Sequence, residues 1–309
     1  MDWLYFSVQA AFLWSLVNTV DKVAVSRYIE NSVVYLVFTG LASVLPVVVI
    51  GLFFPIESVG FGYVVLSVLT GVLYIGYTFF FFRALQVSDA PAVANMLLLV
   101  PVLSVGVGAI FFGEAYTLIV YLGIALVLFG VLGASTERSD LGSSGFFGRR
   151  ITPALGLMAI SAVITSADYA LQKHILSVTD EVTLFFWSRV GTLSTVLLAM
   201  SAISALRVEF MATLRRMARI VVPISVCNES LDMVAAFSLL AAYARGPLSL
   251  VTTATAIQPL FVLFVVLALN KIRRGLVPSN GGRANFWLRL AAIAISVTGI
   301  YFISVADVN

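Results

Sequence analysis

The sequence is divided into apolar runs of about 20 residues, the length needed to cross a bilayer, and most of the polar breaks between them are short. The chain is 61% hydrophobic and 11% charged, whereas a soluble domain is about 45–50% apolar and about 25% charged. An aqueous fold cannot bury this much apolar surface, so the solvent must be lipid. In lipid, backbone polar groups must be paired within helices or in a closed barrel. The runs are continuous rather than alternating, which predicts an all-α membrane protein.

Ten transmembrane helices in two groups of five are expected. The spans are predicted at 3–26, 33–54, 62–83, 90–112, 116–134, 153–176, 182–204, 217–244, 247–269 and 286–305. A long polar break at 135–152 divides a first five-helix repeat, residues 1–134, from a second, residues 153–309. An odd number of spans in each repeat would make the two repeats inverted relative to each other.

Two pairs of residues indicate an internal duplication. Asp21 corresponds to Asp168, an offset of 168 − 21 = 147, and Pro101 corresponds to Pro259, an offset of 259 − 101 = 158. The difference of 11 residues fits a longer connection between spans seven and eight. Both prolines lie inside spans, where each frees a carbonyl and permits a kink. Pro101 and Pro259 are therefore the predicted hinges.

Basic residues lie mostly on one side of the expected membrane. Of the 18 Lys and Arg residues, only Lys173 and Arg245 fall on the other side, and Arg189 lies within a span. Because cytoplasmic loops carry an excess of Lys and Arg, the basic side is expected in the cytoplasm, with both chain ends outside. A multi-pass protein of the inner (plasma) membrane is predicted.

Polar side chains recur at helical spacing inside five of the spans. Each residue of an α-helix turns by about 100°, so residues three, four or seven apart share a face. The stripes are Trp14, Asn18 and Asp21; Thr70, Tyr74, Tyr77, Thr78 and Phe81; Ser161, Thr165, Asp168 and Gln172; Ser225, Asn228, Glu229 and Asp232; and Thr252, Thr255 and Gln258. A charge at the bilayer centre costs at least ~2.5–3.5 kcal/mol. The stripes should therefore converge on a hydrated interior cavity.

The candidate site residues follow from these stripes. Substrate binding or coupling is assigned to Glu229, Asp232, Asp168, Arg189 and Asn228, and the cavity walls are assigned to Trp14, Asn18, Tyr74, Tyr77, Asn95, Gln172, Thr255 and Gln258. Asp168 and Arg189 lie at similar depth, so the arginine could reach Asp168 or Asp232. Three carboxylates against one guanidinium suggest that a carboxyl exchanges a proton or cation for substrate.

Simpler interpretations of the same residues stay open. A buried Asp168–Arg189 pair could serve only to hold helices together. Ser and Thr residues often bond the carbonyl four residues earlier in membrane helices, and the aromatic stripe of span three could be helix packing. Asp21 and Lys22, near the end of span one, could form a surface pair.

Other chemistry has little support in the sequence. The single cysteine, Cys227, excludes an intrachain disulfide. We find no nucleophile–base pair, no cluster of metal-ligating residues and no phosphate-binding loop. We therefore expect no enzymatic activity, no cofactor, no metal and no nucleic-acid partner.

One stretch of the first half resembles a known family. Residues 83–131, "RALQVSDAPAVANMLLLVPVLSVGVGAIFFGEAYTLIVYLGIALVLFGV", are similar to the EamA-type repeat of the drug/metabolite transporter superfamily. The features that carry the resemblance are Arg83-Ala84-Leu85, Pro91, Pro101, Gly113-Glu114, Gly123 and Gly130. The second half is similar through "ARGPLSLVTTATAIQPLF", with Asn270-Lys271 in place of the Gly-Glu pair.

The resemblance implies a ten-helix carrier built of two inverted repeats. The first four helices of each half would line a central cavity, and small metabolites, often amino acids, would move by alternating access. In such relatives both termini are usually cytoplasmic, the opposite of what the loop charges predict here.

Together these features predict a secondary active transporter, by resemblance an exporter, of a small polar or cationic metabolite, coupled to protons or exchange. The alternatives are a divalent-cation transporter or channel, with the acids as a binding ring, and a flippase of a lipid-linked sugar. Gly123 and Gly130, seven apart on one helix face, predict a close helix contact, within a monomer or across a homodimer.

Overall fold

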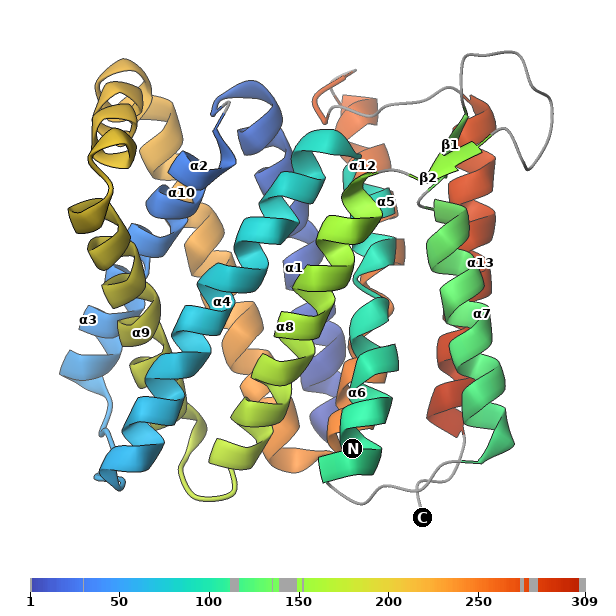
Figure 1. Ribbon diagram of the computed structural model, residues 1–309, viewed down its shortest axis with the longest axis horizontal. Coiled ribbons are helices and arrows are strands. Elements are labelled where there is room, and N and C mark those ends of the chain that lie inside the picture. The colour runs from blue at the N-terminus through green and yellow to red at the C-terminus, as the bar shows by residue number, and fades with distance from the viewer. Residues whose placement is uncertain are drawn as a thin grey trace.

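The computed structural model describes residues 2–29, 31–111, 117–134, 136–138, 149–151, 153–272, 275–277 and 283–305. These residues are almost entirely helical (Figure 1), which confirms the all-α prediction. The helices are α1 (Asp2–Arg27), α2 (Ser32–Ala42), α3 (Val44–Phe53), α4 (Phe61–Val87), α5 (Ala90–Met96), α6 (Leu99–Phe111), α7 (Leu118–Ala134), α8 (Pro153–Ile175), α9 (Glu181–Ala202), α10 (Ser204–Arg245), α11 (Leu248–Thr255), α12 (Gln258–Ile272) and α13 (Arg283–Val305).

The connection expected at 135–152 contains two short strands that the sequence did not predict. β1 (Thr136–Arg138) pairs antiparallel with β2 (Arg149–Ile151). The rest of this connection lies outside the described residues, as do Gly113 and Glu114.

Six helical stretches are long and apolar enough to cross a membrane, judged by length and composition. They are Ser32–Phe53, which joins α2 and α3, Phe61–Val87, Ala90–Phe111, which joins α5 and α6, Pro153–Ile175, Glu181–Ala202 and Ser204–Arg245. Shorter apolar helices are Leu118–Gly130, Gln258–Ile272 and Leu290–Phe302.

Three of the expected spans are interrupted by a short turn, here called a step. The steps lie at Ser43, at residues 97–98 and at residues 256–257. Pro46, Pro101 and Pro259 follow them, each in the first turn of the next helix. An N–H in the first turn has no acceptor within the helix, so proline costs little there. The interruptions thus precede Pro101 and Pro259 rather than lying at the prolines themselves.

The longer connection expected between spans seven and eight, residues 205–216, is itself helical. It forms the beginning of α10, which is 42 residues long and departs from helical geometry at Met217 (φ −133°, ψ 17°). Leu206, Phe210 and Thr213 are buried at spacings of four and three, so this segment is an amphipathic helix. Its arginines misled the prediction because they occupy the opposite face.

The helices run side by side as one bundle, with α7 and α13 paired at one edge (Figure 1). A Cβ atom at Gly130 would collide with Ser296 and with the carbonyl of Ala292, and one at Gly299 would collide with the backbone of Gly123 and Val127. The close contact predicted for Gly123 and Gly130 is therefore made within the chain, against α13.

A second backbone-to-backbone contact joins α4 and α9. A Cβ atom at Gly71 would collide with the carbonyl of Ser188 and with Thr192, and one at Gly191 would collide with the carbonyl of Val68. Such close approach requires residues without a side chain. It brings Tyr74 on α4 beside Arg189 on α9.

Candidate functional site

A buried guanidinium lies at the centre of the bundle. Arg189 on α9 is 3% exposed; its Nη1 is 3.0 Å from Oε1 of Glu229, and its Nη2 is 3.1 Å from Oδ2 of Asp232. Its Cζ atom is also 4.7 Å from the ring centroid of Tyr74 and 4.8 Å from that of Phe185. Two acids and two ring faces thus surround one cation.

The two carboxylates on α10 accept further hydrogen bonds from helices of the first half. Trp14 Nε1 donates to Oδ1 of Asp232 at 2.9 Å, and the Tyr74 hydroxyl donates to Oδ2 at 3.1 Å. The Ser43 hydroxyl donates to Oε1 of Glu229 at 2.9 Å. Ser43 occupies the step between α2 and α3, and its side chain makes no capping bond, so its hydroxyl can donate to the acid. The cluster therefore joins the two halves of the chain.

Asp21 belongs to the interior, so its interpretation as half of a surface pair is wrong. It is 3% exposed. Its Oδ1 accepts hydrogen bonds from the Tyr35 hydroxyl at 2.8 Å and from Asn228 Nδ2 at 2.7 Å. Lys22 is also buried, and its Nζ donates to the carbonyls of Leu85 and Ser88 at the end of α4. The packing of α2, α4 and α10 around α1 covers both residues.

Asp168 does not bond to Arg189. Its Oδ2 accepts a hydrogen bond from Gln172 Nε2 at 2.8 Å, while its Oδ1 is buried without a hydrogen-bond partner. The sequence left Asp168 and Asp232 as possible partners of the arginine. The structure pairs it with Asp232, and its other partner is Glu229. Asp168 is thus buried at 1% exposure with one oxygen left unsatisfied.

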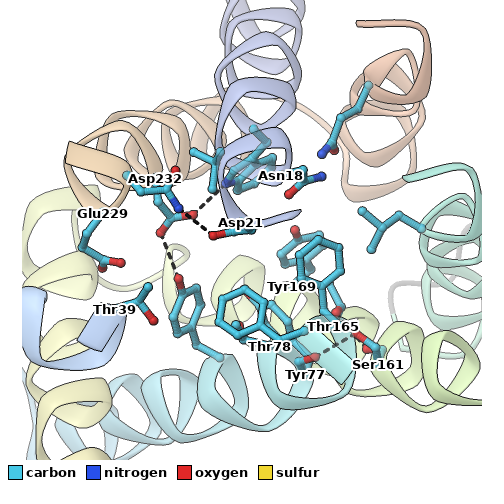
Figure 2. Close-up of a pocket in the computed structure, with 18 residues that line it drawn as sticks. Asn18, Asp21, Thr39, Tyr77, Thr78, Ser161, Thr165, Tyr169, Glu229 and Asp232 are labelled. Atoms are coloured by element: carbon cyan, nitrogen blue, oxygen red, sulfur yellow. Dashed lines mark hydrogen bonds between the residues drawn. The ribbon is translucent and has the colours of Figure 1, made fainter. Parts of the chain in front are cut away.

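Three small cavities lie in the interior, two of them beside the cluster and a third that shares lining residues with the first. The first, about 90 Å³ and drawn in Figure 2, has Asp21, Glu229 and Asp232 on one side and Tyr77, Tyr169 and Thr165 on the other. The second, about 30 Å³, is lined by groups that include Asp168, Gln172 and Arg189. The third, about 50 Å³, lies beside the step before Pro259 and is lined by groups that include Thr255 and Gln258. A water molecule needs roughly 10–15 Å³ of such space, so each cavity is large enough for water.

Most of the residues assigned to the cavity walls line one of these cavities. Trp14, Asn18, Tyr74, Tyr77 and Gln258 line the first, Gln172 lines the second and Thr255 lines the third. Asn95 is the exception, because its Nδ2 donates instead to the Gly130 carbonyl of α7. It lies on the side of α5 that faces α7, so its assignment to the cavity is corrected.

Sequence reasoning missed several groups that complete the site. Tyr35, Ser43, Tyr169 and Phe185 contact the acids or the arginine, or line the cavities. Tyr35, Ser43 and Phe185 belong to no polar stripe with charged residues. Tyr169 lies four residues after Thr165 and three before Gln172, so the stripe of span six could have indicated it. The correspondence between Asp21 and Asp168 was a usable indication that Asp21 lies in the interior.

Among the described residues, no group of three or more His, Cys, Asp or Glu side chains is placed to hold a metal ion. Several polar atoms that border the cavities are buried without a partner, including Asn18 Nδ2, Asp168 Oδ1 and Arg189 Nε. Unsatisfied buried polar atoms are costly, which makes them candidates for contacts with water or a bound molecule.

Comparison with known proteins gives a family match over residues 1–136 and a structure of similar fold. No curated protein matches the sequence. The crystal structure of another protein is similar to this chain, with a TM-score of 0.59 and 17% sequence identity, over 97% of this chain and 98% of the other. At this identity the similarity shows the fold alone. The model of the EamA-like transporter family matches residues 1–136. With six apolar helices long enough to span a bilayer, the chain is a multi-pass integral membrane protein. The resemblance to the EamA-like transporters, a family of the drug/metabolite transporter superfamily, is thereby confirmed over residues 1–136.

Proposed function

We propose that the protein is a secondary active transporter that carries a small polar or cationic metabolite, such as an amino acid, through the central cavities. The observation that carries the proposal is the buried Arg189, bonded to both Glu229 and Asp232 beside cavities in the middle of the bundle. Charged groups inside a membrane domain are expensive and generally mark a pathway for substrate or ions.

The proposed architecture is ten membrane crossings in two inverted repeats, residues 1–134 and 153–309, joined by 135–152. A matching pair of lysine contacts supports it. Lys22 on α1 donates to the carbonyls of Leu85 and Ser88, and Lys173 on α8 donates to those of Tyr243 and Gly246. The two residues of each carbonyl pair have the same spacing in the sequence. The offset between the pairs is 243 − 85 = 158 for the first residues and 246 − 88 = 158 for the second, the same as the offset between Pro101 and Pro259.

Helix packing supports the same architecture. In inverted repeats, α1 would correspond to α8, and α4 to α10. The contact of α1 with α10 should then match that of α8 with α4, and these two pairs are indeed about equally extensive. In Figure 1, α1 begins at the lower end of the bundle and α8 at the upper end, so they run in opposite directions.

The size of the cavities supports a conformational cycle as part of this proposal. Ligand pockets usually measure about 300–1,000 Å³, and the largest of the central cavities is about 90 Å³. A substrate therefore needs a wider state than the one described. The steps at residues 97–98 and 256–257, one in each half, are the proposed hinges of an alternating-access movement.

The charges favour a cationic substrate or an exchange with protons. The described residues lining the first two cavities include four carboxyl groups, from Asp21, Asp168, Glu229 and Asp232, and one guanidinium. A positively charged substrate group or protons would offset the excess. The proposed setting is the plasma membrane, with the basic end of the bundle in the cytoplasm. Export is the proposed direction from the family resemblance alone.

Comparing metabolites in the medium and in cells, with and without the protein, tests this function. A transporter of this type should change the distribution of a small polar or cationic compound, and purified protein in liposomes should then move that compound. Ion conductance in liposomes without any organic substrate would contradict the proposal.

A second candidate is a flippase for a lipid-linked sugar. An apolar hollow of about 650 Å³ runs along α6 and α8, lined in part by Leu103, Ile110, Val163 and Ala167. An acyl chain would fit such a surface. Transfer of a fluorescent lipid-linked sugar between leaflets, blocked by Ala167→Trp, would favour this candidate.

A further inference from the structure

We infer that Asp21 and Asp168 are two repeat-related subsites for an ammonium group, one in each of the first two cavities. This inference rests on the proposed transport function and specifies its substrate class. The two acids correspond in the duplicated sequence and lie at similar distances from the ends of their helices, since 27 − 21 = 6 and 175 − 168 = 7. Because α1 and α8 run in opposite directions, the two subsites lie toward opposite ends of the bundle.

The Asp21 subsite has a carboxylate and an unused donor. Asp21 is held through Oδ1 by the Tyr35 hydroxyl and Asn228 Nδ2, both neutral groups, and no salt bridge is formed to it among the described residues. One helical turn earlier, Asn18 lines the same cavity at 6% exposure, and its Nδ2 is buried without a partner. Figure 2 shows Asn18 and Asp21 bordering this cavity.

The Asp168 subsite repeats this arrangement in the second cavity. Its Oδ2 is held by a neutral donor, Gln172, and its Oδ1 is buried and unpartnered. The arginine that lines the same cavity directs its two terminal nitrogens to Glu229 and Asp232 instead. Both acids thus differ from the arginine-bound pair, which already has its cation.

A layer of aromatic rings separates the two subsites. Trp14, Tyr74, Tyr77 and Tyr169 line both cavities, so a molecule passing from Asp21 to Asp168 must pass between them. Ring faces attract cations, and alkylated ammonium groups are bound by such rings in many proteins. The combination of one carboxylate on each side with rings between fits an organic ammonium better than an anion, which the four acids would repel.

Three probes of similar size test the charge preference. Ethylammonium, ethanol and acetate are added to the purified full-length protein in nanodiscs, and thermal unfolding is recorded, because a bound ligand raises the unfolding temperature. Ethylammonium should stabilise the parent, whereas ethanol and acetate should not. Asp21→Asn and Asp168→Asn should each raise the ethylammonium concentration needed for the same stabilisation roughly tenfold or more. The double variant should lose the response.

Two controls accompany these variants. Glu57→Gln changes an exposed carboxylate between α3 and α4 and should respond as the parent does. Asp21→Glu and Asp168→Glu keep the charge and should retain a response. Stabilisation by ethanol equal to that by ethylammonium, or an undiminished response in the double variant, would overturn the inference.

Thiol labelling tests the placement without altering either acid. Asn18→Cys and Gln172→Cys are made separately with Cys227→Ala, and an impermeant trimethylammonium methanethiosulfonate is applied to intact cells and to inverted vesicles. The thiol of the Asn18→Cys variant should react from one side of the membrane and that of the Gln172→Cys variant from the other, and ethylammonium should slow both reactions. Reaction of both from the same side, or no slowing by ethylammonium, would contradict the subsites. A neutral or anionic substrate found by metabolite profiling would also contradict them while leaving the transport function in place.

Discussion

In the proposed two-repeat architecture, the two halves of the chain share their framework but not their central charges. Each half has a carboxylate on its first helix, Asp21 on α1 or Asp168 on α8. Each half also has a lysine that donates to carbonyls at the end of a later helix, α4 in the first half and α10 in the second. Only the second half contributes the central arginine, together with Glu229 and Asp232. The first half contributes neutral donors to that cluster, such as Trp14 and Ser43.

This difference separates what the fold requires from what the site adds. Features found in both halves are the lysine contacts, which hold helix ends together, and the helix steps, which are the proposed hinges. The arginine cluster occurs once and lies on α9 and α10, so it breaks the symmetry of the scaffold. Helix packing is also unequal, because α4 lies along α9 more extensively than α2 lies along α10. We attribute the closer contact to Gly71 and Gly191.

The largest effect is expected where the halves differ most. Arg189→Met would leave Glu229 and Asp232 buried without their cation, a change that typically costs about 3–5 kcal/mol. Thermal unfolding in detergent should show a marked loss of stability, and transport should be abolished. The triple variant with Glu229→Gln and Asp232→Asn should recover stability but not transport. If Arg189→Met alone were as stable as the parent, the cluster would not be the buried ion group described here.

A smaller and equal effect is expected at the lysine contacts. Lys22→Met and Lys173→Met each remove charge-assisted hydrogen bonds, which are worth about 1.5–3 kcal/mol. Each variant should loosen its own end of the bundle and so increase thiol labelling in the nearer cavity. For Lys22→Met the labelled thiol is that of an added Asn18→Cys change, and for Lys173→Met it is that of an added Gln172→Cys change. Effects of both lysine substitutions on the same side of the membrane would show that the halves are not inverted.

The smallest effect concerns the close helix pair. Gly71→Ala would push α4 from α9 and should cost about 1–3 kcal/mol, as overpacking does in tight cores. Gly76→Ala is the matched control, since a Cβ atom there would meet only the side chain of Ile164 at ordinary distance. It should leave stability unchanged or raise it by about 0.5–1 kcal/mol through helix propensity. Equal behaviour of the two variants would mean that the α4–α9 backbone contact is absent.

Much of this site could be predicted because a helix has a fixed period. The stripes on spans one, three, six and eight meet in the interior, where Glu229, Asp232 and Arg189 come together. The stripe on α1 pointed Asp21 to the interior but left a surface pair open, because its burial depends on helices α2, α4 and α10 that pack over it. The role of Ser43 was not predicted, because it depends on the step between α2 and α3. Asn95 was assigned to the cavity wrongly, because the polarity of a side chain does not show which neighbouring helix it faces.

The most direct test of the central claim is transport by the protein with Glu229→Gln and Asp232→Asn, reconstituted in liposomes with the substrate found by metabolite profiling. Both changes keep the shape of the side chains and remove the charges that bind Arg189 and line the first cavity. If the acids govern passage through the centre of the bundle, the folded double variant should lose coupled transport. Transport at the parent rate would contradict the account.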